Sequence, residues 1–356
     1  MYQPNFSFTV KMVNEISQIE RLYGQLQTEK LIPSLALKLA QENQILATHY
    51  STSIEGNPLS PRDVTNTILD DKIPTTKSEA EVVNYFKVLN QVFSFARDKK
   101  QITPQSVLEL HHMLMRGIEK KDLGKFRDSG VFIGHREKTG EYVVKHNPPY
   151  HTEKDISDAI VELFTWAEED KNLHPLIRAG IIHHQFAYIH PFFDGNGRMA
   201  RIITAYFLLL HKYEVVKYFI LDDYYDIDRT EYSDMLHSAD KPGKGESKAD
   251  KTSWLEYFLE GIVNSLTAAF GKIEELKRGN LDDLEGEKRV LVSKREEDVL
   301  QIVVDRKAIK SSDIVERLSV SRQQAHQLIS SLVRKKLLTK YGKTKQSYYK
   351  LTNAKK

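Results

Sequence analysis

His190-Pro-Phe-Phe-Asp-Gly-Asn-Gly-Arg-Met-Ala-Arg201 is the stretch that decides the fold of this 356-residue chain. Apolar residues recur with helical spacing on both sides of it, from Leu176 to Ile189 and from Met199 to Leu210. The glycines inside it permit backbone torsions that other residues avoid. The pattern therefore predicts two buried helices joined by a tight loop, with the second helix starting at about Asn196 or Gly197.

This loop has the composition of a phosphate-binding site. The first backbone N–H groups of a helix have no partner within the helix, and they attract anions to its N-terminus. Gly195 and Gly197 allow a ligand to approach the backbone closely. Arg198 and Arg201 add planar guanidinium groups, which bind phosphate through paired hydrogen bonds. We therefore predict an anion site at the start of the second helix.

Two further side chains indicate group transfer rather than anion binding alone. Asp194 would repel a bare phosphate, but it suits a Mg²⁺ ion that bridges phosphate oxygens. His190 is a residue type that titrates near neutral pH, so it is placed to accept a proton from an incoming hydroxyl. Together these groups predict phosphoryl or nucleotidyl transfer. The alternative is a helix corner in which Asp and Asn serve only as caps.

The stretch resembles the signature of Fic-domain proteins, His-x-Phe-x-(Asp/Glu)-Gly-Asn-Gly-Arg-x-x-Arg, at every fixed position. The resemblance implies a protein adenylyltransferase, which moves AMP from ATP to a Ser, Thr or Tyr hydroxyl of a target protein or of itself. Family members with Lys in place of Gly197 act as kinases, so this glycine favours AMP transfer. The implied roles are general base for His190, Mg²⁺ ligand for Asp194, anion hole for Gly195, Asn196 and Gly197, phosphate contacts for Arg198, and core anchor for Phe192.

An acidic residue upstream stands where a helix disfavours it. Residues 33–54 carry a helical apolar pattern, and Gly56-Asn57-Pro58 is typical of a helix end. Glu55 thus falls at the negative end of the helix dipole and calls for a cationic partner from elsewhere in the fold. An exposed pair with a surface Lys or Arg is the simplest reading of such a residue.

The same segment resembles the inhibitory motif of the family, (Ser/Thr)-x-x-x-Glu-(Gly/Asn), through Ser51 and Glu55 within residues 51–56. The resemblance implies that Glu55 pairs with Arg201 and occupies space that the γ-phosphate of ATP needs. It therefore implies an adenylyltransferase that is autoinhibited by Glu55. In some members the same Glu supports removal of AMP from the target, so a bifunctional enzyme stays an alternative.

Residues 124–146 predict a hairpin, with strands at 131–133 and 142–144 and a turn at 138–140. An ordinary surface hairpin is one interpretation. The resemblance implies a flap whose exposed edge pairs with the backbone of the target protein. It also implies nucleotide contacts, by Val131, Phe132, Ile133 and Gly134 from the flap and by Tyr232 on the adenine. A plain core position is the alternative for Tyr232.

The C-terminal part differs from the rest in charge. Residues 306–356 hold 14 Lys or Arg and two Asp or Glu, a net charge of +12, whereas residues 1–305 carry −9. Helical patterns at 296–304, 311–318 and 322–336, followed by strands at 338–341 and 346–351, predict a winged helix-turn-helix. Arg322, Gln323, Gln324 and Gln327 would lie on its outer face, so DNA is a candidate partner. Docking to a protein is the alternative.

We therefore predict a mainly α fold, in which a Fic helical core with a short β-hairpin flap precedes a small α/β winged-helix domain. The expected divisions are an N-terminal helical region at 1–110, the Fic core at 111–276, a polar linker at 277–289 and the winged domain at 290–356. The chain has no cysteine, which excludes disulfides and thiolate zinc sites. Nothing in it resembles a signal peptide or a membrane span, so we expect a cytoplasmic protein without a membrane partner. A homodimer is the default assembly.

Two other functions remain open. The first is a DNA-binding transcriptional regulator whose Fic-like core senses a nucleotide. The second is a metal hydrolase that uses His183, His184, His190 and Asp194, although these residues lack a usual metal-ligand spacing.

Overall fold

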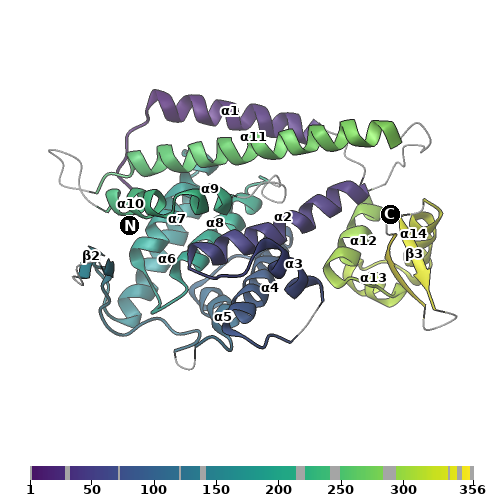
Figure 1. The fold of residues 1–356 in the computed structure, drawn as a ribbon, viewed down its shortest axis with the longest axis horizontal. Helices are drawn as coiled ribbons and strands as arrows, with labels where there is room; N and C mark the ends of the chain where they lie inside the picture. Colours follow the sequence, from purple (N-terminus) through teal and green to yellow (C-terminus); the bar gives the residue numbers. More distant parts are fainter. Residues whose placement is uncertain are drawn as a thin grey trace. The chain divides into compact units, whose positions relative to one another are not determined.

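The computed structural model describes residues 2–28, 33–70, 73–119, 122–136, 142–213, 221–240, 249–283, 294–335, 337–342 and 347–352. The chain forms two compact units (Figure 1). The first unit is Met1–Gln27 with Asn43–Lys272, and the second is Thr28–Glu42 with Ile273–Lys356. The boundary predicted at residues 110 and 111 is therefore not a division between units, because the N-terminal helices and the predicted loop share one unit.

Caps and prolines account for many of the helix starts. Ser60, Thr76, Thr103 and Thr152 each accept a hydrogen bond from the third residue of the helix that follows. The helices up to the second unit are α1 (Val10–Thr28), α2 (Pro33–Ile54), α3 (Pro61–Leu69), α4 (Lys77–Arg97), α5 (Pro104–Met115), α6 (Glu153–Glu169), α7 (Pro175–Ile189), α8 (Asn196–Leu210), α9 (Leu221–Ile227), α10 (Arg229–Ser238) and α11 (Thr252–Asp283).

Helices α7 and α8 lie at the centre of the first unit. Helix α8 packs against α7 and α4, while α6 packs against α7. The indole of Trp254 in α11 is fully buried and donates a 2.8 Å hydrogen bond to the carbonyl of Gly180 in α7. A side chain at position 180 would lie 2.7 Å from Leu255 Cδ2, so glycine permits this close approach. The loop between α7 and α8 is thus carried by the hydrophobic core.

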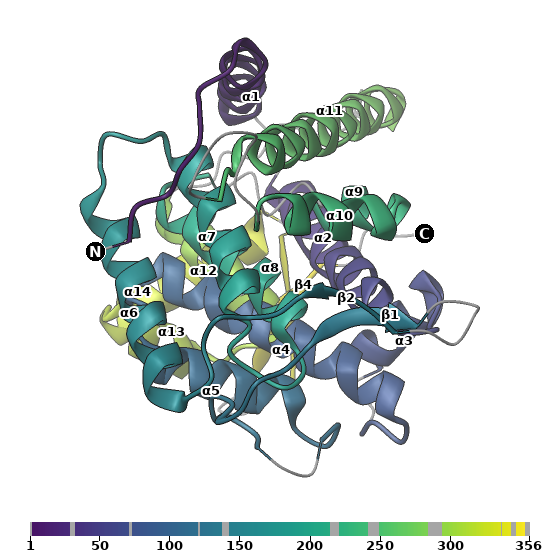
Figure 2. The ribbon, with the colours of Figure 1, turned by 90° about the vertical axis from the view of Figure 1, so that its left-hand side faces the viewer.

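A two-stranded antiparallel hairpin, β1 (Ile133–Arg136) with β2 (Tyr142–His146), lies on the side of the chain seen in Figure 2. The first strand starts two residues later than predicted, and Val131 and Phe132 precede it. A bulge between Ile133 and Gly134 shifts the register, and a Cβ at position 134 would lie 1.9 Å from the carbonyl oxygen of Val143. The predicted turn at 138–140 lies outside the described residues.

The second unit has its own hydrophobic core. Its elements are α12 (Lys294–Arg306), α13 (Ser311–Leu318), α14 (Arg322–Arg334), β3 (Leu338–Tyr341) and β4 (Tyr348–Leu351). The strands pair antiparallel, so three helices precede a hairpin, as the sequence predicts. Helix α11 continues to Asp283, so residues 277–283 of the predicted linker are helical. Residues 284–289 lie outside the described part of the chain.

Among the helices that the structure describes, none combines the length and the apolar character needed to cross a membrane.

Candidate active site

Helix α8 begins at Asn196, as predicted. Gly195 caps it in the left-handed conformation, with φ of 82°, and provides no side-chain hydrogen bond to the first turn. The first backbone N–H groups of α8 therefore have no side-chain cap at this end. This is the geometry of an anion site at a helix N-terminus.

The side chain of Asn196 shapes the loop rather than facing a ligand. Its Oδ1 accepts a 2.9 Å bond from the backbone N–H of Phe192, and its Nδ2 donates a 2.8 Å bond to the carbonyl of the same residue. Both ends of the amide are thus engaged with Phe192. Only the backbone N–H of Asn196 is therefore available for the expected anion hole.

His111 in α5 supports the same loop, although no sequence pattern predicts this role. Its ring stacks on Phe192 with centroids 3.6 Å apart and an angle of 2°. Nδ1 accepts from the backbone N–H of Gly124, so Nε2 carries the proton and donates a 3.1 Å bond to the Asp194 carbonyl. Burial lowers the pKa of His111 to about 4, which keeps this neutral tautomer in place.

His190 is held by its backbone, which the predictions did not anticipate. It ends α7 in the left-handed conformation, with φ of 50°. The fully buried Arg127 donates to three carbonyls, those of His190 at 2.7 Å, Ser129 at 2.7 Å and Ile189 at 3.3 Å. The backbone N–H of Arg127 also bonds to the Pro191 carbonyl at 2.9 Å. Arg127 thus fixes the backbone from which the imidazole projects.

The imidazole of His190 is in the form that a base needs. Burial lowers its pKa to about 4, and the side chains of His146 and Arg127 contribute to this decrease. A hydrogen bond to the backbone of Ala187 opposes this shift. At neutral pH the ring is therefore uncharged and has one nitrogen able to accept a proton.

Arg198 is a buried cation with unused donors. Its Nη2 lies 3.1 Å from Asp194 Oδ1, which also accepts from the Gly195 N–H at 2.5 Å. Its Nε and Nη1 are buried and have no hydrogen-bond partner within the described residues. Because buried polar groups are nearly always paired, these two donors fit an anionic ligand.

Asp194 fits the expected Mg²⁺ in one specific sense. The described residues contain no group of three His, Cys, Asp or Glu side chains that could hold a metal alone. The Asp194 side chain is 45% exposed, however, beside the donors that suit phosphate. Mg²⁺ commonly binds one or two carboxylates together with substrate phosphates and water, so a single carboxylate here is sufficient.

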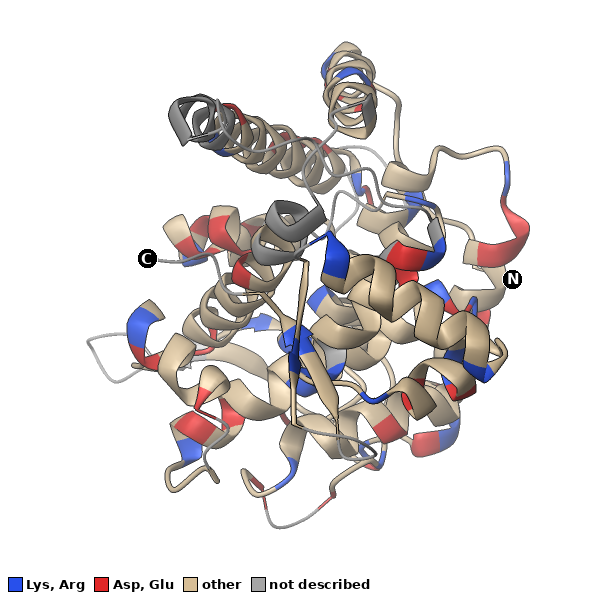
Figure 3. Cartoon of the chain, turned by 90° about the vertical axis from the view of Figure 1, so that its right-hand side faces the viewer, with Lys and Arg blue, Asp and Glu red and all other residues tan. Residues whose placement is uncertain are grey.

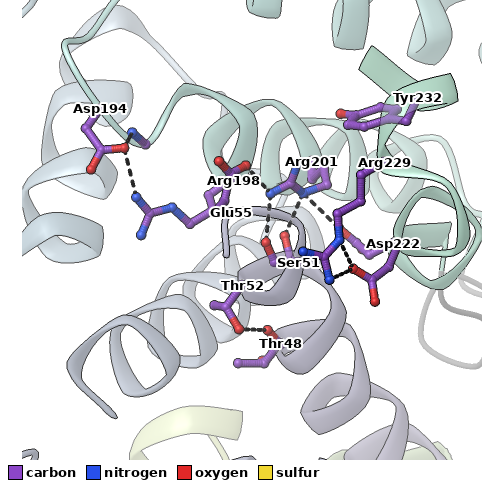
Figure 4. A network of polar contacts seen from close by, with 12 residues as sticks. Thr48, Ser51, Thr52, Glu55, Asp194, Arg198, Arg201, Asp222, Arg229 and Tyr232 are labelled. Atoms are coloured by element: carbon purple, nitrogen blue, oxygen red, sulfur yellow. Dashed lines mark hydrogen bonds and ion pairs between the residues drawn. The ribbon is translucent and has the colours of Figure 1, made fainter. Parts of the chain in front are cut away.

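The side chain of Arg201 contacts the end of α2 (Figure 4). Its Nη2 donates to Glu55 Oε1 at 2.8 Å and to the Ser51 carbonyl at 2.9 Å, and its Nε donates to Ser51 Oγ at 2.6 Å. Burial lowers the pKa of Arg201, but the charges of Glu55 and Asp222 outweigh burial and raise it. The cation predicted for Glu55 is therefore Arg201.

Glu55 also lies over the first turn of α8. A Cβ at position 197 would be 2.4 Å from Glu55 Oε1 and 3.2 Å from Arg201 Nη1. Arg201 Nη1 has no hydrogen-bond partner among the described residues. A carboxylate thus occupies the space in front of the α8 N-terminus, next to a free guanidinium donor.

The segment Leu221–Arg229 makes further contacts with this network, which the sequence did not predict. Asp222 Oδ1 in α9 forms a second ion pair with Arg201, at 3.0 Å from Nε. Arg229 donates to Ser53 Oγ at 2.8 Å and pairs with Asp226 at 2.7 Å. The end of α2 is therefore held by two arginines, Arg201 and Arg229.

Tyr232 lies in the core, and its ring is not exposed to a ligand at the loop. It is 5% exposed, stacks on Tyr225 with centroids 4.2 Å apart, and its hydroxyl lies 2.8 Å from His183 Nε2. This burial favours the core interpretation over an adenine contact. On the hairpin, by contrast, Phe132 is 66% exposed, while Val131, Ile133 and Gly134 are partly buried.

His183 and His184 do not support a metal hydrolase. His183 bonds to Tyr232 and Thr204. His184 bonds to Asp240 and Lys251. Both rings are thus engaged on both nitrogens with other partners. Burial lowers the pKa of both, that of His184 to about 4.

Comparisons with known proteins show which family part of the chain resembles. Residues 101–208 match the sequence profile of the Fic/DOC family. A protein adenylyltransferase Fic of Drosophila grimshawi is 26% identical over 171 residues, which cover 47% of this chain and 33% of that protein. The chain therefore spans about a third of the length of this curated relative.

Two solved structures share the fold. The crystal structure of a Fic family protein from Desulfovibrio desulfuricans G20 aligns over 100% of both chains, with a TM-score of 0.63 and 24% identity. Residues 134–508 of Fic-1 from C. elegans align with a TM-score of 0.58 and 20% identity, over 74% of this chain and 73% of that one.

Proposed function

From the Fic/DOC family domain at residues 101–208, we propose that this protein is a protein adenylyltransferase that transfers AMP from ATP to a hydroxyl of a target protein. The observation that carries the proposal is the set of buried, unpaired guanidinium donors on Arg198 and Arg201 beside the uncapped start of α8. Such donors fit the phosphates of a nucleotide. His190 stands at the same loop in its neutral form.

In the proposed reaction the acceptor oxygen forms a bond to the α-phosphorus of ATP, and the bond between the α- and β-phosphates breaks to release pyrophosphate. His190 takes the hydroxyl proton. Arg198 and the α8 N–H groups bind the outer phosphates and stabilise the charge that develops there. Mg²⁺, held by Asp194 and phosphate oxygens, would neutralise charge on the leaving pyrophosphate.

We further propose that the resting enzyme is autoinhibited by Glu55. The carboxylate occupies the anion position over Gly197 and takes a donor of Arg201 that phosphate would use. Ser51 adds two bonds to the same arginine. Removal of AMP by the same protein, with Glu55 assisting, is the bifunctional alternative.

Labelling with ATP that carries the isotope on the α- or the γ-phosphate tests the proposal. We expect Glu55→Gly to incorporate the α-label into itself or into a lysate protein, and His190→Ala in that background to lose it. Glu260→Gln is the control, because this exposed carboxylate pairs with Lys11 outside the loop. Incorporation of the γ-label would indicate a kinase instead, and no incorporation of either label would contradict the proposal.

The flap is the proposed docking edge for the target. Its residue Phe132 is largely exposed, and Gly134 leaves no room for a side chain against the facing strand. An extended segment of the target can add its backbone beside such a strand. Phe132→Ala should therefore raise the KM for a protein target more than the KM for ATP.

A second candidate function belongs to the C-terminal unit, which we propose to be a winged helix-turn-helix that binds DNA. Figure 3 marks the basic and acidic positions on the side of the chain that carries it. Arg322, Gln323 and Gln327 on α14 are exposed, as are Lys340 and Lys350 on the hairpin. Gln324 is also exposed, but its side chain accepts from the Ser321 N–H at 3.0 Å as a helix cap.

Binding to random duplex DNA at increasing salt tests this second function. Phosphate contacts predict an affinity that falls steeply with salt, and Lys340→Ala with Lys350→Ala should reduce the salt slope. A sequence-specific complex without AMP transfer would favour a transcriptional regulator. No salt-dependent binding would leave protein docking as the role of this unit.

A further inference from the structure

Three buried titratable side chains and the partly buried Asp240 form a continuous set of hydrogen bonds in the first unit. His146 Nδ1 lies 2.9 Å from Asp240 Oδ2, and His184 Nε2 lies 3.0 Å from Asp240 Oδ1. Lys251 Nζ lies 2.9 Å from His184 Nδ1. We call these four residues the polar cluster. It connects the end of β2, the middle of α7, the residue pair after α10 and the residue before α11.

The partners of His146 determine its protonation. Nε2 lies 2.9 Å from the carbonyl oxygen of Tyr188, and a carbonyl can only accept. Nδ1 faces Asp240. Burial raises the pKa of Asp240, but hydrogen bonds from His146 and His184 outweigh burial and hold it below the usual range. Both nitrogens of His146 therefore donate, and the ring is an imidazolium.

His184 is neutral by the same reasoning. The ammonium of Lys251 can only donate, so His184 Nδ1 accepts and Nε2 donates to Asp240. Burial lowers the pKa of Lys251 to about 8, which still leaves it a cation at neutral pH. The polar cluster thus contains two cations and one carboxylate.

The polar cluster bears on His190 by position and by charge. The Tyr188 carbonyl, which accepts from His146, lies two residues before His190 in the last turn of α7. The His146 imidazolium is also one of the charges that disfavour a proton on His190, and the guanidinium of Arg127 acts in the same direction.

We propose that His146 and Asp240 are positioning residues for His190. They hold the end of the flap strand β2 against the last turn of α7, and the charge of His146 keeps His190 free to accept a proton. This inference rests on the proposed function of His190 as the base. Asp240 contributes by keeping His146 charged.

The charged and titratable groups around His146 determine whether its loss raises or lowers the pKa of His190. Helix α10 and the residues after it contribute Asp240 and His237, whose ring lies 6.0 Å from that of His146. Helix α7 contributes His184 and Tyr188, whose ring lies 4.9 Å away. Asp240 is the carboxylate in this set. If His146 loses its positive charge, the negative charge of Asp240 is no longer balanced by it, and a proton on His190 becomes more favourable.

Histidine NMR titration of the full-length protein tests the electrostatic part without requiring transfer. We expect His146→Gln to raise the midpoint of the His190 titration by roughly half a pH unit, as the loss of a nearby unit charge predicts. His146→Arg keeps the charge and donors for both acceptors, so its midpoint should match the wild type. An unchanged midpoint in His146→Gln would overturn the inference, and so would an equal rise in both variants.

Hydrogen exchange at the backbone amides of residues 143–146 tests the mechanical part. We expect about fivefold faster exchange or more in His146→Gln and in Asp240→Asn, with His146→Arg like the wild type. Unchanged exchange in Asp240→Asn would overturn the inference even if His146→Gln did not fold. A protein that shows both effects but transfers no AMP would contradict the proposed function instead.

Discussion

The loop at 190–201 and the end of α2 meet at Arg201, but they are held in different ways. The loop is built into the interior: Arg127 is fully buried against its backbone, and His111 stacks on Phe192. Arg201 also bonds to the backbone of α2 at Ser51, but the side chain of Glu55 is 35% exposed where its partner Arg201 is only 2% exposed. The comparison indicates that the loop is part of the core, whereas the carboxylate beside it lies at the surface.

A change within the loop should have the largest effect. In a Glu55→Gly background, Arg198→Ala should lower kcat/KM for ATP by roughly two to three orders of magnitude, because it removes donors to developing charge. Steady-state kinetics with labelled ATP measures this. Arg97→Ala, on the exposed end of α4, is the matched control. A decrease in kcat/KM of less than threefold would contradict the view that the loop, and not the end of α2, carries the chemistry.

Acidification should reveal how strongly the interior depends on neutral imidazoles. Burial lowers the pKa of His111, His184, His190 and His211 to about 4. The unfolded chain therefore binds more protons than the folded one between about pH 6.5 and 4, so stability falls as the pH falls through this window.

We expect Tm to be lower by about 10 °C or more at pH 4.5 than at pH 7. Calorimetry at several pH values checks this, with His326→Gln as a control at an exposed position of α14. A Tm that stays constant over the window would contradict the assignment of these rings as neutral.

Glu55→Gln separates charge from bulk at the end of α2. The amide keeps the volume over Gly197 but loses the ion pair with Arg201, and a hydrogen bond to a charged group contributes about 1.5–3 kcal/mol. Partial exposure of Glu55 reduces that value, so we expect about tenfold higher basal transfer than in the wild type. Basal activity equal to the wild type, with Glu55→Gly active, would assign the inhibition to bulk alone.

The smallest expected effect comes from Arg229, which bonds to Ser53 rather than to the loop. Arg229→Gln should raise basal transfer about twofold, because an exposed side-chain contact to α2 contributes only a few tenths of a kcal/mol. Auto-labelling of the purified protein measures it. A decrease instead would mean that Arg229 supports the active state and does not restrain α2.

Local patterns predicted what local interactions determine. The start of α8 at Asn196 follows from Gly195, and the end of α2 at Ile54 follows from the Gly56 stop signal. The pair of Glu55 and Arg201, 146 residues apart, came from a resemblance and not from periodicity. Resemblance also placed Tyr232 on the nucleotide, where the structure buries it against Tyr225.

The support of the loop could not be predicted, because it depends on tertiary contacts. His111 reaches the Asp194 carbonyl across 83 positions, and Arg127 reaches the His190 carbonyl across 63. An arginine in a stretch read as a hairpin gives no sign that it will be fully buried. The bulge between Ile133 and Gly134 could not be predicted for a similar reason, since it depends on the contact of Gly134 with Val143.

The left-handed backbone of His190 implies a trade-off between stability and activity. A residue with a Cβ at φ of 50° is strained by about 1 kcal/mol or more, whereas Gly adopts this region without that cost. His190→Gly should therefore melt at or above the temperature of the wild type while losing the base. The folded state would then be more stable with a residue that cannot act as a base, at the position where the proposed chemistry needs a histidine.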